Sequence, residues 1–136
     1  MKALLAFLLT VLIASAQSYK EFAKDMGYET NYNTALKKAK DENKGLMVVI
    51  ITNNCPWCIR FEKTTLSDKT IDELIKGKYI PLIINKKEGE FPPYLNTPIV
   101  PTTYIIDPKD EKSDYERIGF MGKAEFLELF EELELE

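Results

Sequence analysis

Two cysteines, Cys55 and Cys58, are the residues in this sequence with the clearest capacity for chemistry. Pro56 follows Cys55 and suits the first position of a helix, because its φ is already fixed and it has no N–H to leave unpaired. Two cysteines three positions apart at a helix start share one face, with their sulfurs close enough to bond. The helix N-terminus favours a thiolate, so the pKa of the first thiol should fall below about 8.5. We therefore expect Cys55 to attack a disulfide as the nucleophile and Cys58 to resolve the resulting mixed disulfide.

Two other roles for the cysteine pair are a structural disulfide and part of a zinc site. A disulfide closing so short a loop stabilises a fold by only about 2 kcal/mol, which is less than a crosslink between distant segments would give. Zinc would need two further ligands, and in a sequence without histidine these must be carboxylates or come from another chain. The missing histidine also excludes Ser/His/Asp and Cys/His catalytic groups, and Ile59 after Cys58 excludes covalent haem attachment. We expect no metal and no cofactor.

Elements that would position the cysteines can be read on both sides of them. Residues 46–52 form a continuous apolar run rich in β-branched side chains, which predicts a strand buried on both faces. The helix begun at Pro56 should run to about Leu66. A helix before the strand is predicted from a cap at Asn31 or Asn33 to about Asn43, ended by residues 43–45 with Gly45 as the usual kind of stop.

The remaining segments complete an α/β pattern. We predict a helix over 68–76, stopped by Gly77 and facing inward with Ile71, Leu74 and Ile75. Strands are predicted over 79–85, 102–106 and 115–118, a loop over 86–100, and a last helix on the pattern Phe126, Leu129, Phe130 and Leu133. Residues 19–32 show no clear periodicity and are expected only to lead into the domain. The order predicts one central sheet with helices on both faces.

The N-terminus resembles an export signal. Lys2 is followed by an apolar run over 3–14, and Ala14-Ser15-Ala16 has small residues at the spacing that signal peptidase requires. The run is shorter than the roughly 20 residues needed to span a bilayer, although an uncleaved membrane anchor is the alternative. We expect cleavage near Ala16, a single domain over residues 17–136, and a periplasmic or otherwise exported protein in a compartment where disulfides persist. The net charge of −4, with acids spread along the chain, does not suggest nucleic-acid binding.

Three stretches together resemble the thioredoxin superfamily, and in particular its small exported bacterial members. They are Leu46 to Cys58, Val100 to Asp107, and Ile118 to Gly122, in the family's order. The resemblance implies a thioredoxin fold with a central mixed sheet of about four to five strands. It also implies a cis-proline facing the cysteines, at Pro101, which directly precedes the strand, with Pro98 as the alternative. The backbone of Val100 would then pair with an extended substrate segment.

The resemblance has departures that bear on mechanism. Thioredoxins have a buried Asp on the strand before the cysteines, and the corresponding position here is Val49. A buried carboxylate there would accept a proton from the resolving thiol. The dipeptide between the cysteines is Pro56-Trp57, which is nearer the glutaredoxin type and tunes the potential. Both residues are candidate substrate contacts, while Trp57 has the alternative of packing over the helix start.

The resulting hypothesis is an exported thiol–disulfide oxidoreductase that acts on protein thiols and disulfides. One form of this hypothesis is a reductase of specific periplasmic proteins. Such an enzyme would function as a monomer and would receive electrons from a membrane partner if it is a reductase. The alternative is a non-catalytic binding or assembly module that keeps the thioredoxin surface. The sequence does not give the direction of electron flow.

Overall fold

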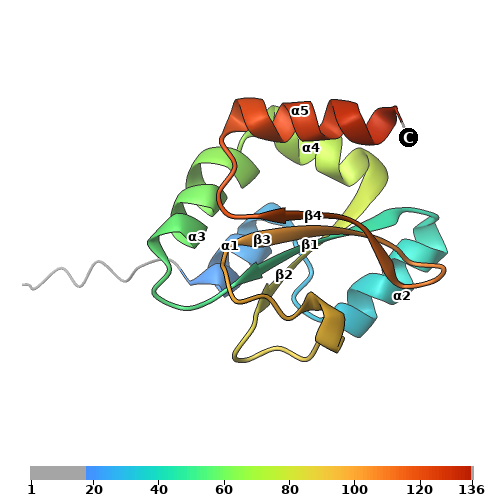
Figure 1. Cartoon of the computed structure of the whole chain (residues 1–136), viewed down its shortest axis with the longest axis horizontal. Helices are drawn as coiled ribbons and strands as arrows, with labels where there is room; N and C mark the ends of the chain where they lie inside the picture. The colour runs from blue at the N-terminus through green and yellow to red at the C-terminus, as the bar shows by residue number, and fades with distance from the viewer. Residues whose placement is uncertain (1–17, 136) are drawn as a thin grey trace, which may run out of the picture.

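The computed structural model describes residues 18–135, which form one four-stranded sheet with the strand order β2-β1-β3-β4. The strands are β1 (Gly45–Ile51), β2 (Tyr79–Asn85), β3 (Thr102–Asp107) and β4 (Lys112–Ile118). β1 pairs in parallel with β2 and antiparallel with β3, and β3 pairs antiparallel with β4 (Figure 1). The sheet is therefore mixed, as expected. The proposed export signal over residues 1–16 lies outside the described residues.

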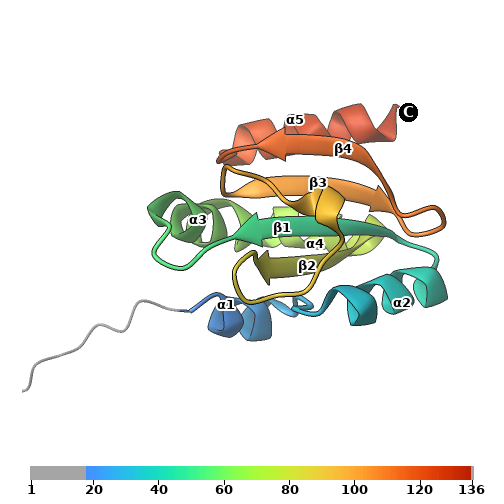
Figure 2. The same cartoon turned by 60° about the horizontal axis from the view of Figure 1, so that its bottom comes forward.

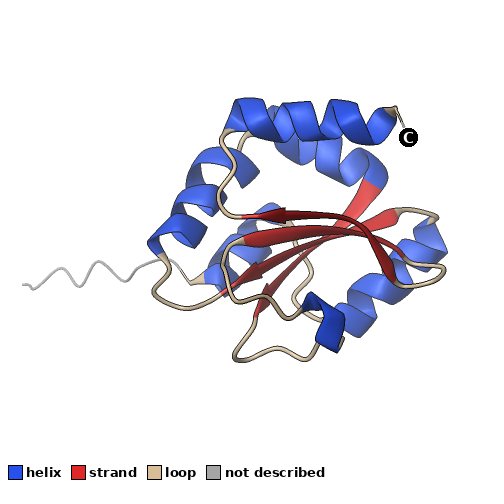
Figure 3. Ribbon diagram, viewed as in Figure 1, coloured by secondary structure: helices blue, strands red, loops and turns tan. Residues whose placement is uncertain are grey.

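Helices cover both faces of the sheet (Figure 3). They are α1 (Tyr19–Met26), α2 (Tyr32–Glu42), α3 (Pro56–Phe61), α4 (Lys69–Lys78) and α5 (Lys123–Glu134), with a π-helical turn over Glu62–Leu66 and a 3₁₀ turn over Pro93–Leu95. α3, α4 and α5 lie over one face, whereas α2 lies against the other (Figures 1 and 2). The predicted α/β architecture is confirmed.

The central strand β1 holds the two layers together. Six of its seven residues, Leu46 to Ile51, are buried, because helices cover both faces. Met47, Val49 and Ile51 join a core with Phe61, Phe126 and Phe130, while Leu46, Val48 and Ile50 join a second core with residues of α2. Because β1 is packed on both faces, its end is held in one position, and so is the start of the loop that leads to Cys55.

The first helix, α1, is the main element that the sequence analysis missed. Ser18 caps it by accepting a hydrogen bond from the N–H of Glu21, and Gly27 ends it with a positive φ of 70°. Phe22 and Ala23 are buried against the core on the α4 side. The segment after α1 then pairs with the outer edge of β2, where Glu29 exchanges two backbone hydrogen bonds with that strand.

Three predicted helix details were wrong. Gly77 does not stop α4, which continues to Lys78 and passes directly into β2. Leu74 does not face inward, since its side chain is 37% exposed, although Ile71 and Ile75 are buried as predicted. The helix α2 ends at Asn43, which adopts the left-handed conformation that Asn tolerates, and Gly45 instead begins β1.

No helix within residues 18–135 has the length and apolar character needed to cross a membrane.

Candidate redox site

The two cysteines lie where β1 passes into α3. After β1 the chain turns through Asn53 and Asn54, and Asn54 adopts a left-handed φ of 55°. Cys55 then occupies the N-cap of α3 in an extended conformation, with Pro56 as the first helical residue. The strand therefore delivers Cys55 to the positive end of a helix, as the sequence predicts.

Cys55 and Cys58 form a disulfide, with their Cα atoms 5.2 Å apart. The backbone N–H of Cys58 donates a hydrogen bond to the sulfur of Cys55 over 3.1 Å. Both residues are largely buried, but Cys55 is 9% exposed and Cys58 only 2%. An N–H aimed at the Cys55 sulfur stabilises its thiolate in the reduced protein, so the geometry can support thiol–disulfide exchange.

Pro101 is brought to the same end of the sheet by the pairing of β1 with β3. Ile50, next to the last residue of β1, pairs with Thr102, and Pro101 immediately precedes Thr102. The Val100–Pro101 peptide bond is cis. The carbonyl of Pro101 accepts a hydrogen bond from the N–H of Gly119, and the hydroxyl of Thr102 donates to the carbonyl of Ile99. These bonds fix the segment that leads into β3.

A shallow apolar groove of about 390 Å³ joins this segment to the start of α3. Its lining residues are Trp57, Ile99, Val100, Pro101, Gly119 and Phe120. Among the described residues, no hydrogen bond engages the backbone N–H or C=O of Val100, so both groups are open to an incoming strand. The structure thus brings Trp57, Val100 and Pro101 together. Pro56 is exposed at the helix start and does not line this groove.

Trp57 is 54% exposed rather than buried over the helix start. Its ring packs against Phe120 with ring centroids 5.5 Å apart, and the Arg60 guanidinium lies 5.3 Å from the Trp57 ring and 5.2 Å from the Phe120 ring. A cation above two aromatic faces holds both rings in place. The exposed indole is therefore a preordered apolar surface beside the disulfide.

Behind the cysteines lies a second cavity, of about 300 Å³, that the sequence analysis did not anticipate. Cys58, Ile59 and Glu62 line it, together with residues at the end of β1 and residues at the start of α1. Glu62 is only 6% exposed, and burial raises the pKa of its carboxyl to about 7, with Lys63 lowering it slightly. The sequence signal for Glu62 is its spacing of four residues from Cys58, which places both side chains on one helical face.

The position expected to hold a buried carboxylate in thioredoxins has none here. Val49 is fully buried and belongs to the same apolar core as both cysteines. Polar groups gather instead at the loop between β1 and α3, where Asn53 donates to Glu88 and accepts from Asn85. Tyr19 also donates to Glu88, which ties α1 to this loop.

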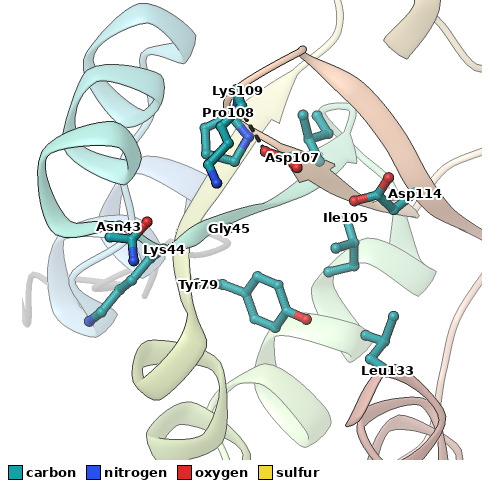
Figure 4. Close-up of a pocket in the computed structure, with 11 residues that line it drawn as sticks. Asn43, Lys44, Gly45, Tyr79, Ile105, Asp107, Pro108, Lys109, Asp114 and Leu133 are labelled. Carbon is teal, nitrogen blue, oxygen red and sulfur yellow. Dashed lines mark hydrogen bonds between the residues drawn. The ribbon is translucent and has the colours of Figure 1, made fainter. Parts of the chain in front are cut away.

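A cavity larger than either of these lies elsewhere. It measures about 550 Å³ and lies around Gly45, at the opposite end of β1 from the cysteines (Figure 4). Lys44, Tyr79, Asp107 and Asp114 are among the residues that line it, and it contains no thiol. Size alone therefore does not identify the reactive site. No group of three or more His, Cys, Asp or Glu side chains within residues 18–135 is arranged to hold a metal ion.

A family model for the thioredoxin-like domain matches residues 32–134. This chain belongs to the thioredoxin-like domain family. The match includes the cysteines, Pro101 and all four strands, so the predicted superfamily is confirmed.

Individual relatives of this thioredoxin-like chain are distant. Anterior gradient protein 2 of Xenopus laevis is 28% identical over 87 residues, which are 64% of this chain and 47% of that protein. The chain thus matches about half the length of that relative. A thioredoxin from Thermus thermophilus superposes with a TM-score of 0.67 at 21% identity, covering 78% of this chain and 85% of the other. A disulphide isomerase from Xylella fastidiosa Temecula1 gives 0.56 at 17%, covering 75% and 87%. These likenesses confirm the thioredoxin fold.

Proposed function

We propose that this thioredoxin-like protein is an exported thiol–disulfide oxidoreductase that exchanges disulfides with protein substrates through Cys55 and Cys58. The observation that carries the proposal is the hydrogen bond from the Cys58 N–H to the Cys55 sulfur, at the N-terminus of α3. It favours the thiolate on the more exposed of the two cysteines. A purely structural disulfide gains nothing from this arrangement, and closing so short a loop adds only about 2 kcal/mol.

The reaction proceeds in two exchanges, each of which forms one S–S bond and breaks another. The Cys55 thiolate attacks a substrate disulfide, forming a Cys55–substrate mixed disulfide and releasing one substrate thiolate. Cys58 loses its proton and attacks the Cys55 sulfur, forming the Cys55–Cys58 bond and releasing the second substrate thiolate. The substrate gains two electrons, its two thiolates take protons from the surrounding water, and the enzyme dithiol becomes a disulfide. An oxidase runs the same steps in reverse.

The groove beside the disulfide supports a protein substrate over a small molecule. It is shallow and apolar, and it is bordered by the unpaired backbone of Val100 and by the exposed ring of Trp57. An extended segment can add to Val100 as a strand, with Pro101 beneath it, while an apolar side chain contacts Trp57. Pro56 keeps the role of setting the start of α3.

Export is supported by the sequence of residues 1–16, in which Lys2, an apolar run and Ala14-Ser15-Ala16 follow in the order of a signal peptide. Cleavage after Ala16 leaves a monomeric domain that begins at Gln17, one residue before the cap of α1. As a reductase of specific periplasmic proteins, the enzyme requires an electron donor across the membrane. N-terminal sequencing of the protein recovered from the cell envelope checks the cleavage position.

Trapping the mixed disulfide tests the proposed activity. In a Cys58→Ser variant, Cys55 should form a stable covalent adduct with a disulfide-containing protein such as insulin, and dithiothreitol should release it. The matched Cys55→Ser variant, which keeps one thiol in the same turn, should form none. Adduct formation by neither variant would indicate a thioredoxin-fold binding module without exchange activity. Equal adduct formation by both would contradict the assignment of Cys55 as the nucleophile.

A further inference from the structure

Glu62 lies one helical turn after Cys58, at the junction of α3 and the π-helical turn. Its backbone N–H donates to the carbonyls of Cys58 and Ile59, so the two side chains leave the helix on the same face. A π-helical turn inserted in a helix marks functional sites more often than chance. Here it begins at Glu62 itself.

The two side chains share a cavity. Glu62 and Cys58 both line the space of about 300 Å³ behind the disulfide, whose other lining residues include Thr52, Asn53 and Asn54. Such a space is large enough for water, and its polar lining gives water partners. A proton can therefore pass between the Cys58 sulfur and the Glu62 carboxyl within the cavity, which shares no lining residue with the substrate groove.

The charges around Glu62 leave its carboxyl without an ion-pair partner among the described residues. Lys63, on the same turn, is exposed and acts on it only at a distance. Tyr19, which also faces the cavity, donates its hydroxyl to Glu88. At the far end of the turn, Asp68 pairs with Lys123 over 2.9 Å. Burial, opposed only by Lys63, raises the pKa of Glu62 to about 7, so the group can both take and return a proton at neutral pH.

We propose that Glu62 is the proton acceptor for Cys58 in the resolving step. The proposal rests on the function proposed above. The Glu62 carboxylate takes the proton from the Cys58 thiol, the Cys58 thiolate attacks the Cys55 sulfur, and the Cys55–substrate bond breaks to release a substrate thiolate. In the reverse direction Glu62 returns the proton to Cys58. In this protein the proton-accepting carboxylate lies on the helix that carries Cys58. The strand position where thioredoxins have a buried Asp is the apolar Val49.

Single-turnover kinetics with the disulfide dimer of nitrothiobenzoate separate the two exchanges. The reduced protein releases one coloured thiolate when Cys55 attacks and a second when Cys58 resolves the mixed disulfide. In Glu62→Gln, the first phase should stay within twofold of wild type, while the second should slow by about 10²-fold at about pH 7.5. In the wild-type protein the rate of the second phase should rise with a midpoint near pH 7, and this midpoint should be lost in the variant.

Glu131→Gln is the control, because Glu131 is an exposed carboxylate on α5 that does not line the cavity. It should leave both phases unchanged. If wild type lacks the first phase, the proposed function fails. If the first phase is present but Glu62→Gln resolves at the wild-type rate, the assignment of Glu62 is overturned. The wild-type profile is a second test that needs no variant: a second phase without a midpoint near pH 7 also overturns it.

Discussion

The backbone N–H of Cys58 points at the sulfur of Cys55 and donates to it over 3.1 Å. This relationship makes the two cysteines inequivalent, because the helix start stabilises negative charge on Cys55 while Cys58 is enclosed by the core.

The first prediction concerns which thiol reacts first. After reduction, brief treatment with iodoacetamide at mildly acidic pH should label Cys55 well before Cys58, because the Cys58 N–H stabilises a thiolate on Cys55 and Cys58 is the more buried of the two. Peptide mass spectrometry reads the two positions separately. Faster labelling of Cys58 would reverse the assignment of nucleophile and resolving thiol.

The second prediction concerns substrate docking. Trp57→Ala should weaken exchange with a protein disulfide by roughly 5- to 30-fold, mainly through a higher KM, because truncating an exposed interface aromatic costs about 1–2 kcal/mol of binding. Exchange with the small nitrothiobenzoate dimer should change little. Leu74→Ala, which removes an apolar side chain exposed on α4, is the control and should affect neither rate. An equal loss with both substrates would place Trp57 in support of the cysteines instead of the docking surface.

The third prediction concerns the pH dependence of stability. The carboxyl of Glu62 has its pKa raised from 4.5 to about 7 by burial, so the folded protein holds this proton where the unfolded chain has lost it. Stability from this group is present below about pH 4.5 and is lost as the pH rises through about 7. The loss at high pH reaches about 3 kcal/mol, and Glu62→Gln should not show it.

Urea denaturation of the oxidised proteins at pH 4 and pH 8 measures this effect. The gain in free energy of unfolding from Glu62→Gln should be larger at pH 8 than at pH 4. A difference that is the same at both pH values would mean that Glu62 ionises normally in the folded protein.

The fourth prediction concerns the core beneath the site. Phe61 is fully buried between Phe120 and Phe126, with ring centroids 6.1 and 6.2 Å away. Phe61→Ala should lower the free energy of unfolding by about 3–5 kcal/mol, since it leaves a cavity under α3. Leu74→Ala should cost about 0.5 kcal/mol or less, as expected at an exposed position. Equal costs would mean that Phe61 does not anchor α3.

The sequence predicts most of this fold because its strongest signals are local. The continuous apolar run of β1, Pro56 after Cys55, and the spacing of Phe126, Leu129 and Phe130 each depend on a few adjacent residues. The helix α1 was missed since its buried face is small, although Ser18 and Gly27 mark its ends. Gly77 was misread because α4 is held by packing of Ile71 and Ile75, which outweighs the preference of one glycine.

The site is predictable only in part, because some of its contacts depend on residues far apart in the sequence. Cys55 and Cys58 are adjacent in sequence, and Pro101 follows from the resemblance to thioredoxins. The arrangement of Arg60 over Trp57 and Phe120 depends on how the end of β4 meets α3, which no local pattern encodes. The burial of Glu62 likewise depends on α1 closing one side of its cavity.

Catalysed exchange between glutathione and a protein disulfide tests the central claim most directly. Wild-type protein should accelerate the exchange in catalytic amounts, and Cys55→Ser, with Cys58 and the fold retained, should reduce the rate to the uncatalysed background. A Cys55→Ser variant that exchanges disulfides as fast as wild type would contradict the account.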